Sequence, residues 1–516
     1  MLPNRPKLQV FLLAVAALLI VFASGLWILR SHHPPPAPLP PFQVPNDDQA
    51  TGDSRTSLRS LRNARGQFMT LDPTGKFLLD SVSNRPVFVT GDSAWSLQGQ
   101  LSDEEIELYL ADRASKGFNL IVMELVENYY SNNAPHDVYG KEPFNGDDFT
   151  NENPAYWLRV DYTIRRAAAH GITILADPAF VGFDCKGTKG GYCQSYHNSS
   201  KEVIQNYGEF LGSRYKDASN IIWLIGGDAN PEDIDLQLKL YALAKAIRLK
   251  DLTHLMTAEN SRGASSLDVW SGAAWLDINA LYLKPADILA RTTAAYKKDQ
   301  LPIFLLEDWY EGSNSLTELD VRKQGYWAVL SGSTLGRVFG NYAIWNFSWT
   351  SETKDPWRAQ LDSPGSKGQS ILGKLFRSRE HWKLVPDADH EVLTAGYDPR
   401  SWFSHVTEWL RSWIYQVPFR LQSNASVAAR SSDGQSIIVY IPGGSTATVA
   451  IDMSKITDPS SHASCWWFDP RNASTRFIGI FPTRGIQKFT PPEKSDWVLV
   501  IDSQAANLAS PGSKDL

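Results

Sequence analysis

Residues 86–347 repeat one pattern, in which a short apolar run is followed by a longer stretch with amphipathic helical periodicity. Apolar runs of this length predict strands, and the stretches between them predict helices. The strand-like runs cover residues 86–92, 118–127, 172–178, 221–230, 254–260, 276–283, 301–308 and 338–347. Eight strands, most of them followed by a helix, predict a (β/α)8 barrel, the fold known as a TIM barrel.

Helix signals and strand composition support the barrel. Ser102 with Glu105 forms a capping-box pattern before the first long helix, and Gly171 ends the helix that begins near Asn153. The strands are almost continuously apolar, as a parallel sheet covered on both faces requires. An open, doubly wound sheet would also alternate strands with helices, but no Gly-x-Gly-x-x-Gly motif follows the first strand.

The pattern changes after about residue 410. Short alternating runs appear there, separated by Asp-Gly, Gly-Gly and Asp-Pro turns, and they predict a small all-β sandwich. We therefore expect the barrel domain to cover residues 67–410, the sandwich residues 411–503, and a polar tail residues 504–516.

The N-terminus carries an uncharged apolar run at residues 10–29, long enough to span about 30 Å as a helix. Arg5 and Lys7 precede the run, which favours a cytoplasmic N-terminus and places the rest of the chain outside the cytoplasm. We expect residues 1–33 to be a transmembrane anchor and residues 34–66 a proline-rich linker. A cleaved signal peptide is the alternative, because Val21-Phe22-Ala23 resembles a cleavage site, and the protein would then be secreted.

Composition and charge narrow the classes of partner. The chain has 516 residues and a formal net charge of −6, so it lacks the basic surface that nucleic-acid binding needs. It contains 18 Trp, 19 Tyr and 22 Phe. Aromatic residues at this density suit the flat, partly apolar faces of sugars, although large hydrophobic cores would also account for many of them.

The cysteines suggest a covalent link in one loop. Cys185 and Cys193 flank seven residues, and a disulfide between them fits a location outside the cytoplasm. Zinc binding with Asp184 and His197 is the alternative, but C-x7-C-x3-H is not a recurrent ligand spacing. We expect no metal and no cofactor, and Cys465 is interpreted as a buried core residue.

Carboxylates and aromatic residues stand where the predicted strands end. Catalytic groups of such barrels lie at the C-terminal ends of the strands. No Gly-x-Ser-x-Gly motif, P-loop, Cys/His nucleophile pair or His-Glu-x-x-His motif occurs in the sequence. The strand ends carry Asp92 and Trp95, Glu124 and Glu127, Asp177, Asp228, Glu259 and Asn260, Tyr282, Glu307 and Asp308, and Trp345.

Asp228 and Glu307 are the predicted catalytic pair. They end the fourth and seventh strands, which lie across the barrel from one another. Acetal hydrolysis needs two such carboxyl groups, one to protonate the departing oxygen and one to attack or to activate water. Their separation would be about 5–5.5 Å in a retaining enzyme and about 6.5–9.5 Å in an inverting one.

Each carboxylate also has a structural interpretation. Asp228 follows two glycines and could be a turn residue or a helix N-cap, although a helix starting at Asn230-Pro231 would not need it as a cap. Glu307 could form a structural ion pair, for which Glu311 is the better candidate. Glu124 and Glu127 could shape the pocket or pair with arginine.

Several motifs occur in a fixed order along the chain. They include GDSAW (91–95), YLADRASKGFN (109–119), RYKDASNIIWLIGGDAN (214–230), EDWYEG (307–312) and YWAVLSGSTLGRVFGNYAIWNF (326–347). Together they resemble the apiosidase-like glycoside hydrolases, which are (β/α)8 enzymes with retaining chemistry. The C-terminal stretch CWWFDPRNASTRFIGIFPTRG resembles the β-sandwich that accompanies these enzymes and is labelled a collagen-binding domain. The resemblance covers about residues 70–503.

The resemblance places the family's acid/base on Asp228 and its nucleophile on Glu307. The usual pattern has an arginine after that Asp and a proline after that Glu, whereas this chain has Ala229 and Asp308. These two departures leave the catalytic pair intact. They mean that a preference for apiose cannot be inherited.

We therefore expect a retaining glycoside hydrolase that acts on plant or microbial polysaccharides. Its partners would be an oligo- or polysaccharide and, through the N-terminal helix, a membrane. A non-catalytic glycan- or matrix-binding protein on a degenerate barrel is the alternative function. The residues expected to bind substrate are Asp92, Trp95, Glu124, Asp177, Asn230, Glu259, Tyr282, Glu311 and Trp345.

Overall fold

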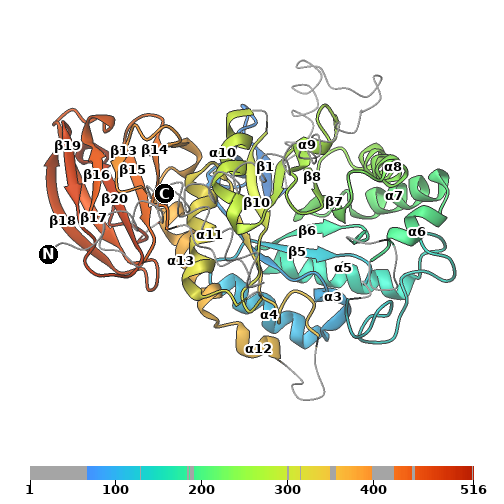
Figure 1. Ribbon diagram of the computed structural model, residues 1–516. Helices are drawn as coiled ribbons and strands as arrows, with labels where there is room; N and C mark the ends of the chain where they lie inside the picture. The colour runs from blue at the N-terminus through green and yellow to red at the C-terminus, as the bar shows by residue number, and fades with distance from the viewer. Residues whose placement is uncertain are drawn as a thin grey trace, which may run out of the picture. The chain divides into compact units, whose positions relative to one another are not determined.

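The structure is a computed structural model (Figure 1). It describes residues 67–127, 130–182, 185, 191–298, 301–313, 315–348, 356–397, 424–443, 448–513 and 515–516. The predicted anchor (1–33), the predicted linker (34–66) and Asp184 lie outside these residues. Within the described ranges, no helix has the length and apolar character needed to cross a membrane.

Eight parallel strands form the central sheet, in the order β8-β7-β6-β5-β4-β11-β10-β9. The helices lie outside this sheet (Figure 1). This architecture agrees with the predicted barrel, and each strand overlaps one predicted run. The strands are β4 (Val89–Ser93), β5 (Leu120–Glu124), β6 (Thr173–Asp177), β7 (Ile221–Ala229), β8 (Met256–Asn260), β9 (Asn279–Tyr282), β10 (Ile303–Glu307) and β11 (Gly336–Phe339).

The eighth strand is shorter than its apolar run predicts. β11 ends at Phe339, whereas the predicted strand extended to residue 347. Asn341 ends the extended conformation, because its side-chain oxygen accepts a hydrogen bond from Ala343 N at 2.9 Å and its carbonyl accepts one from Ile344 N at 3.0 Å. Trp345 therefore stands in a loop above the barrel, not on a strand.

The two ends of the eight-strand order, β8 and β9, are joined mainly through side chains. Thr257 Oγ1 donates to Ile278 O at 2.8 Å. Ser266, which opens the short helix α9 (Ser266–Val269), donates to Ala258 O at 2.6 Å and accepts from Ala280 N at 3.0 Å. These hydroxyl groups take the place of a regular backbone ladder and bring the last two strands together.

The helices begin and end largely where their capping residues predict. The capping box is present, because Ser102 Oγ accepts from Glu105 N and the Glu105 side chain accepts from Ser102 N. Gly171 directly follows the helix end and has a φ of 71°. The main helices are α4 (Asp103–Ser115), α5 (Pro154–Ala169), α7 (Lys201–Tyr215), α8 (Ile234–Lys250), α10 (Ile288–Lys298), α11 (Glu318–Leu330) and α13 (Pro364–Arg377), with shorter α3 (Leu97–Gln100), α6 (Cys193–Asn198) and α12 (Pro356–Gln360).

The helix that follows β7 starts later than the sequence predicts. We expected it to start at Asn230-Pro231, but α8 begins at Ile234 with Asp233 as its N-cap. Asn230 instead accepts a hydrogen bond from Glu232 N at 3.0 Å and forms a turn. The side chain of Asp233 accepts from Leu236 N, which satisfies a helix N-terminus that Asn230 cannot reach.

The C-terminal part consists of two antiparallel sheets, ordered β12-β14-β15-β20-β17-β18 and β13-β16-β19. Apolar residues from both sheets, among them Val439, Ile451 and Leu499, form one buried cluster between them. β12 and β13 precede residue 411 and so lie within the range expected for the barrel domain. The strands are β12 (Leu384–Pro386), β13 (Leu393–Ala395), β14 (Val427–Ser431), β15 (Ser436–Ile441), β16 (Val449–Asp452), β17 (His462–Phe468), β18 (Thr475–Pro482), β19 (Ile486–Phe489) and β20 (Trp497–Ser503).

Glu311, in the loop after β10, is bound by the N-terminus of α13. Its Oε1 accepts from Gly365 N at 2.7 Å, and its Oε2 accepts from Ser363 Oγ at 2.5 Å and Asn341 Nδ2 at 3.0 Å. A carboxylate at this end of a helix satisfies free backbone N–H groups and interacts favourably with the helix dipole. This contact fixes the β10 loop to α13.

Glu311→Ala is expected to lower the free energy of unfolding by about 2 kcal/mol, because it removes a charged acceptor from the first turn of α13. Equilibrium unfolding in urea would measure the change. Glu318→Ala, which truncates a mostly exposed glutamate, serves as the control and should change the value by less than about 0.5 kcal/mol. Unchanged stability in Glu311→Ala would show that this contact does not hold the helix.

Candidate active site

The C-terminal ends of the barrel strands and the loops after them enclose a cavity of about 310 Å³. Both predicted catalytic carboxylates line it, together with four of the residues expected to bind substrate. The lining residues are Trp95, Glu124, Tyr130, Phe180, Asp228, Arg262, Tyr282, Glu307, Asp308, Trp309, Tyr310, Ser313, Tyr342 and Trp345.

A β-bulge at the end of β7 presents Asp228 to this cavity. In the pairing with β8, Gly226 lies opposite Glu259 and Ala229 lies opposite Asn260, so two residues of β7 have no partner. Asp228 is one of them and has a φ of 56°, in the left-handed region that few non-glycine residues adopt. The bulge therefore places this side chain by backbone geometry that a regular strand could not provide.

The two glycines before Asp228 are required by close packing. A Cβ on Gly226 would lie 2.4 Å from the carbonyl oxygen of Glu259. A Cβ on Gly227 would lie 2.4 Å from the ring of Phe180 and 2.8 Å from Asp177 Oδ2. Both glycines also have positive φ, of 115° and 75°. The bulge that carries Asp228 therefore requires glycine at both preceding positions.

Glu307 reaches the cavity from β10, which also departs from regular pairing. Leu305 pairs with Leu281 and Glu307 with Tyr282, so one residue of β10 is skipped. Glu307 and Tyr282 thus stand side by side at the rim of the barrel, and both line the cavity.

The two carboxyl groups titrate as a pair. Burial raises the pKa of Asp228 to about 6, against the opposing effect of the Arg262 charge. Burial, and next the charge of Asp228, raise the pKa of Glu307 to about 8, while a hydrogen bond from Tyr282 acts in the opposite direction. Because each negative charge hinders ionisation of the other group, the pair holds one proton between about pH 6 and pH 8.

Tyr282 and Arg262 orient Glu307. Arg262 donates through Nε at 3.1 Å and Nη2 at 2.7 Å to the hydroxyl oxygen of Tyr282. With that oxygen used as an acceptor, the O–H proton of Tyr282 remains to be donated to Glu307. The hydrogen bond from Tyr282 lowers the pKa of Glu307 and so favours its ionised form.

Glu259 is a third carboxyl group beside the pair. It is 2% exposed, and its two oxygens accept no hydrogen bond from any described residue. Burial raises its pKa well above the usual range, and the charges of Glu307 and Asp228 raise it further. Burial therefore favours the neutral form of Glu259, which is able to donate a hydrogen bond to a neighbouring carboxylate.

Aromatic residues form one wall of the cavity. Trp95 and Tyr130 both meet Phe180 edge to face, with ring centroids 5.2 and 5.7 Å apart, and Tyr130 meets Trp345 at 5.5 Å. Trp95 Nε1 donates to the hydroxyl of Tyr310 at 3.1 Å. This mutual contact holds the rings in place and leaves an apolar surface facing the carboxylates.

Sequence reasoning missed several cavity residues. Tyr130, Phe180, Arg262 and Tyr310 all come from loops, two or more residues after the strands end. Their positions follow no periodicity, so only their residue type could have suggested them. The prediction looked at strand ends and therefore found carboxylates but not this part of the wall.

Five residues expected to bind substrate do not line the cavity. Asp92 is buried between Tyr109, whose hydroxyl donates at 2.6 Å, and Arg113 at 3.3 Å. Asp177 accepts from Ala179 N and lies beneath the glycines of the β7 bulge. Asn230 forms the turn before α8, and Glu311 binds α13. Glu259 also lies outside the lining, and the charges of Glu307 and Asp228 raise its pKa.

The structure accounts for one of the two departures from the family pattern. Asp308 forms a buried ion pair with Arg337, whose Nη2 lies 2.7 Å from Asp308 Oδ2. Ala229 is fully buried on β7 and brings no charge to the cavity. Arg262, two residues beyond β8, supplies a cation to the cavity instead.

Solved structures similar to this chain are glycoside hydrolases. One structure, titled "Glycoside hydrolase", has a TM-score of 0.69 and 23% identity, covering 85% of this chain and 98% of its own. A glycoside hydrolase family 5 structure from Bacteroides vulgatus ATCC 8482 also has a TM-score of 0.69 and 23% identity, covering 86% and 93%. At this identity the likeness shows the shared fold. A search of curated protein sequences found no match.

Two family models match the chain. Residues 417–502 match the "Putative collagen-binding domain of a collagenase". Residues 73–383 match the "Apiosidase-like, catalytic domain", and this match covers more than half of the chain and contains every residue of the cavity. The chain therefore belongs to the apiosidase-like family and is a glycoside hydrolase.

Proposed function

We propose that the protein hydrolyses glycosidic bonds with retention of configuration, with Asp228 as general acid/base and Glu307 as nucleophile. The observation that carries this proposal is the convergence of the two carboxyl groups on one cavity, where they titrate as a coupled pair. The first step of the reaction requires the proton on Asp228 and an ionised Glu307. Because the pKa of Glu307 is the higher of the two, the free pair holds its proton mainly on Glu307, and the reactive arrangement is the less populated one.

The proposed reaction has two steps. Glu307 attacks the anomeric carbon while Asp228 gives its proton to the departing glycosidic oxygen, which leaves a covalent glycosyl ester on Glu307. Asp228 then takes a proton from water, whose oxygen attacks the same carbon and releases Glu307. The hydrogen bond from Tyr282 favours the ionised form of the nucleophile.

Glu259 supports Glu307 in this scheme. A neutral carboxyl group donates a hydrogen bond to a carboxylate without adding a second negative charge. Burial favours the neutral form of Glu259, and a neutral Glu259 stabilises the negative charge on Glu307. An ionised Glu259 would repel that charge. Glu259 is thus a positioning residue, which acts on the reaction through Glu307.

The proposed substrates are side chains of plant or microbial polysaccharides. The wall of Trp95, Tyr130, Phe180 and Trp345 offers rings to the apolar face of a sugar. Arg262 provides a cation at the cavity, and Ala229 stands where the family has an arginine, so we propose a sugar preference that differs from apiose. The apolar run at residues 10–29 would anchor the enzyme with its catalytic domain outside the cytoplasm.

Asp228→Asn and Glu307→Gln are each expected to lower kcat/KM by about 10²–10⁴-fold or more, because each removes one of the two chemical groups. A panel of polysaccharides and aryl glycosides would first identify a substrate, and proton NMR of the product would then establish its anomeric configuration. Asp389→Asn and Glu318→Gln, on exposed carboxylates, are the controls. Full activity in either catalytic variant, or an inverted product, would contradict the proposal.

The pH profile of kcat/KM is expected to be bell-shaped, with limbs near pH 6 and pH 8. Below about pH 6 both carboxyl groups are protonated and the nucleophile is lost. Above about pH 8 both are ionised and no proton remains for the leaving oxygen. Initial rates at low substrate concentration from pH 4 to about 10 would measure both limbs, and a profile with one limb would exclude a shared proton.

Glu259→Gln is expected to leave the acidic limb of this profile nearly unchanged, because an amide is also a neutral donor. Glu259→Leu removes the donor, so the pKa of the nucleophile rises and the acidic limb moves to higher pH. The same rate profiles measure both variants. A shift of the limb to lower pH in Glu259→Gln would mean that Glu259 is charged, and it would overturn the assigned role.

A further inference from the structure

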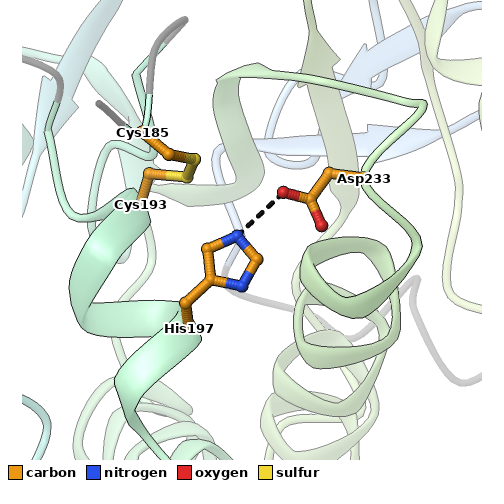
Figure 2. Close-up of side chains that lie close together, drawn as sticks. All are labelled: Cys185, Cys193, His197 and Asp233. Carbon is orange, nitrogen blue, oxygen red and sulfur yellow. Dashed lines mark hydrogen bonds and ion pairs between the residues drawn. A yellow bond between two sulfur atoms is a disulfide. The ribbon is translucent and has the colours of Figure 1, made fainter.

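Four side chains with metal-binding atoms converge outside the catalytic cavity. They are Cys185 in the loop after β6, Cys193 and His197 on α6, and Asp233 at the start of α8. Figure 2 shows these side chains gathered in the space between α6 and α8. One ligand atom from each lies within 4.8 Å of the other three. The two cysteines are joined in a disulfide.

The set of donors matches the chemistry of zinc. Structural zinc sites are tetrahedral and take thiolate sulfur, imidazole nitrogen and carboxylate oxygen as ligands. With metal–ligand bonds of about 2.0–2.3 Å, the ligand atoms of such a site lie about 3–4 Å apart. Only small side-chain movements would bring the four atoms to these separations once the sulfur–sulfur bond is broken.

His197 is already oriented as a metal ligand. Its Nδ1 lies 3.0 Å from Asp235 Oδ2, and Lys239 Nζ holds the same oxygen at 2.8 Å. A zinc-bound histidine characteristically donates its second ring N–H to a carboxylate, which fixes the ring and its tautomer. Nε2, the other ring nitrogen, points to Asp233 Oδ2 at 2.8 Å (Figure 2).

Asp233 has one oxygen available for a metal. Its Oδ1 accepts from Leu236 N and caps α8, while Oδ2 faces only the imidazole among the contacts of the described residues. A zinc ion between Oδ2 and Nε2 would replace the direct contact between these two atoms. Capping of the helix would continue through Oδ1.

We propose that Cys185, Cys193, His197 and Asp233 form a Zn²⁺ site when the disulfide between the two cysteines is reduced. A phosphine reductant breaks the sulfur–sulfur bond by supplying two electrons and becomes the phosphine oxide. Water supplies the oxide's oxygen and the two thiol protons. Zinc binding then releases the protons of both thiols, and the neutral imidazole of His197 binds the metal through Nε2.

The site connects two loops that carry parts of the catalytic cavity. Tyr192 N and Cys193 N donate to the carbonyls of Phe180 and Val181 at 2.8 and 3.0 Å, so the cysteine loop is fixed to the cavity wall. Asp233 follows Asp228 by five residues. The disulfide closes only the β6 loop on itself, whereas zinc would also bond this loop to the start of α8.

The test uses the purified full chain, reduced with a phosphine that is then removed without oxygen. We expect the reduced protein to bind one Zn²⁺ in competition with a chromophoric chelator, with a dissociation constant in the nanomolar range or below. Co²⁺ in its place should give thiolate-to-metal charge-transfer absorption. The oxidised protein should bind at least about 10³-fold more weakly, because two of its four ligands are absent.

Variants identify the ligands. Cys185→Ser combined with Cys193→Ser should abolish the charge-transfer absorption, and Asp235→Asn should weaken zinc binding by about 10–100-fold while leaving all four ligands in place. His197→Gln should weaken it more than His170→Gln, the control histidine, which lies at the C-terminal end of α5 and binds Glu107. The proposal would be overturned if the reduced protein bound zinc no more tightly than the double cysteine variant does. It would also be overturned if both histidine variants lost zinc affinity equally.

Discussion

The burial of carboxyl groups side by side at the mouth of the barrel is the constraint on which the active site depends. Desolvation is the largest influence on Asp228, Glu259 and Glu307, and in each case it raises the pKa. Ionised groups at this density would repel one another, so the site retains protons at pH 7. The same environment that makes the cluster costly in free energy contains the proposed general acid and the proposed nucleophile.

The shape of the backbone at the strand ends follows from this constraint. A regular strand alternates its side chains between the barrel interior and the helix layer, so it cannot present consecutive groups to one cavity. The bulges on β7 and β10 shift the register at Asp228 and Glu307. Gly226 and Gly227 make the first bulge sterically feasible, since any Cβ there would collide with Glu259 or Phe180. Local strain at Asp228 thus accompanies its exposure to the cavity.

Other carboxylates near the strand ends serve the fold because a hydrogen-bond donor of the protein reaches them. Asp92 meets Arg113, Asp308 meets Arg337, and Glu311 meets the first turn of α13. The contacts of Asp92 and Glu311 fix a strand end and a loop to helices α4 and α13, whereas Asp308 meets an arginine on the neighbouring strand β11. The carboxyl groups at the barrel mouth therefore divide into two kinds, according to whether they face a structural partner or the substrate cavity.

The sequence alone determined the order of strands and helices and the positions of Asp228 and Glu307. Both depend on local patterns, namely apolar runs of strand length and a carboxylate where such a run ends. It also indicated the barrel, and through its motifs the family, since eight strands in series and six ordered motifs are visible without coordinates. The predicted end of β11 and the predicted start of α8 were wrong. The side chain of Asn341 forms a turn within the apolar run, and the side chain of Asp233, not the Asn-Pro pair before it, caps α8.

Only the tertiary structure decided which of the strand-end carboxylates share a cavity and which are paired elsewhere. Asp92 and Glu311 look like Asp228 and Glu307 in sequence, and their different roles come from Arg113 and Gly365, residues distant in the chain. The same holds for Arg262 in the cavity and for Asp233 beside His197. A side chain's function here depends on partners brought close by barrel closure, and sequence periodicity contains no information about those partners.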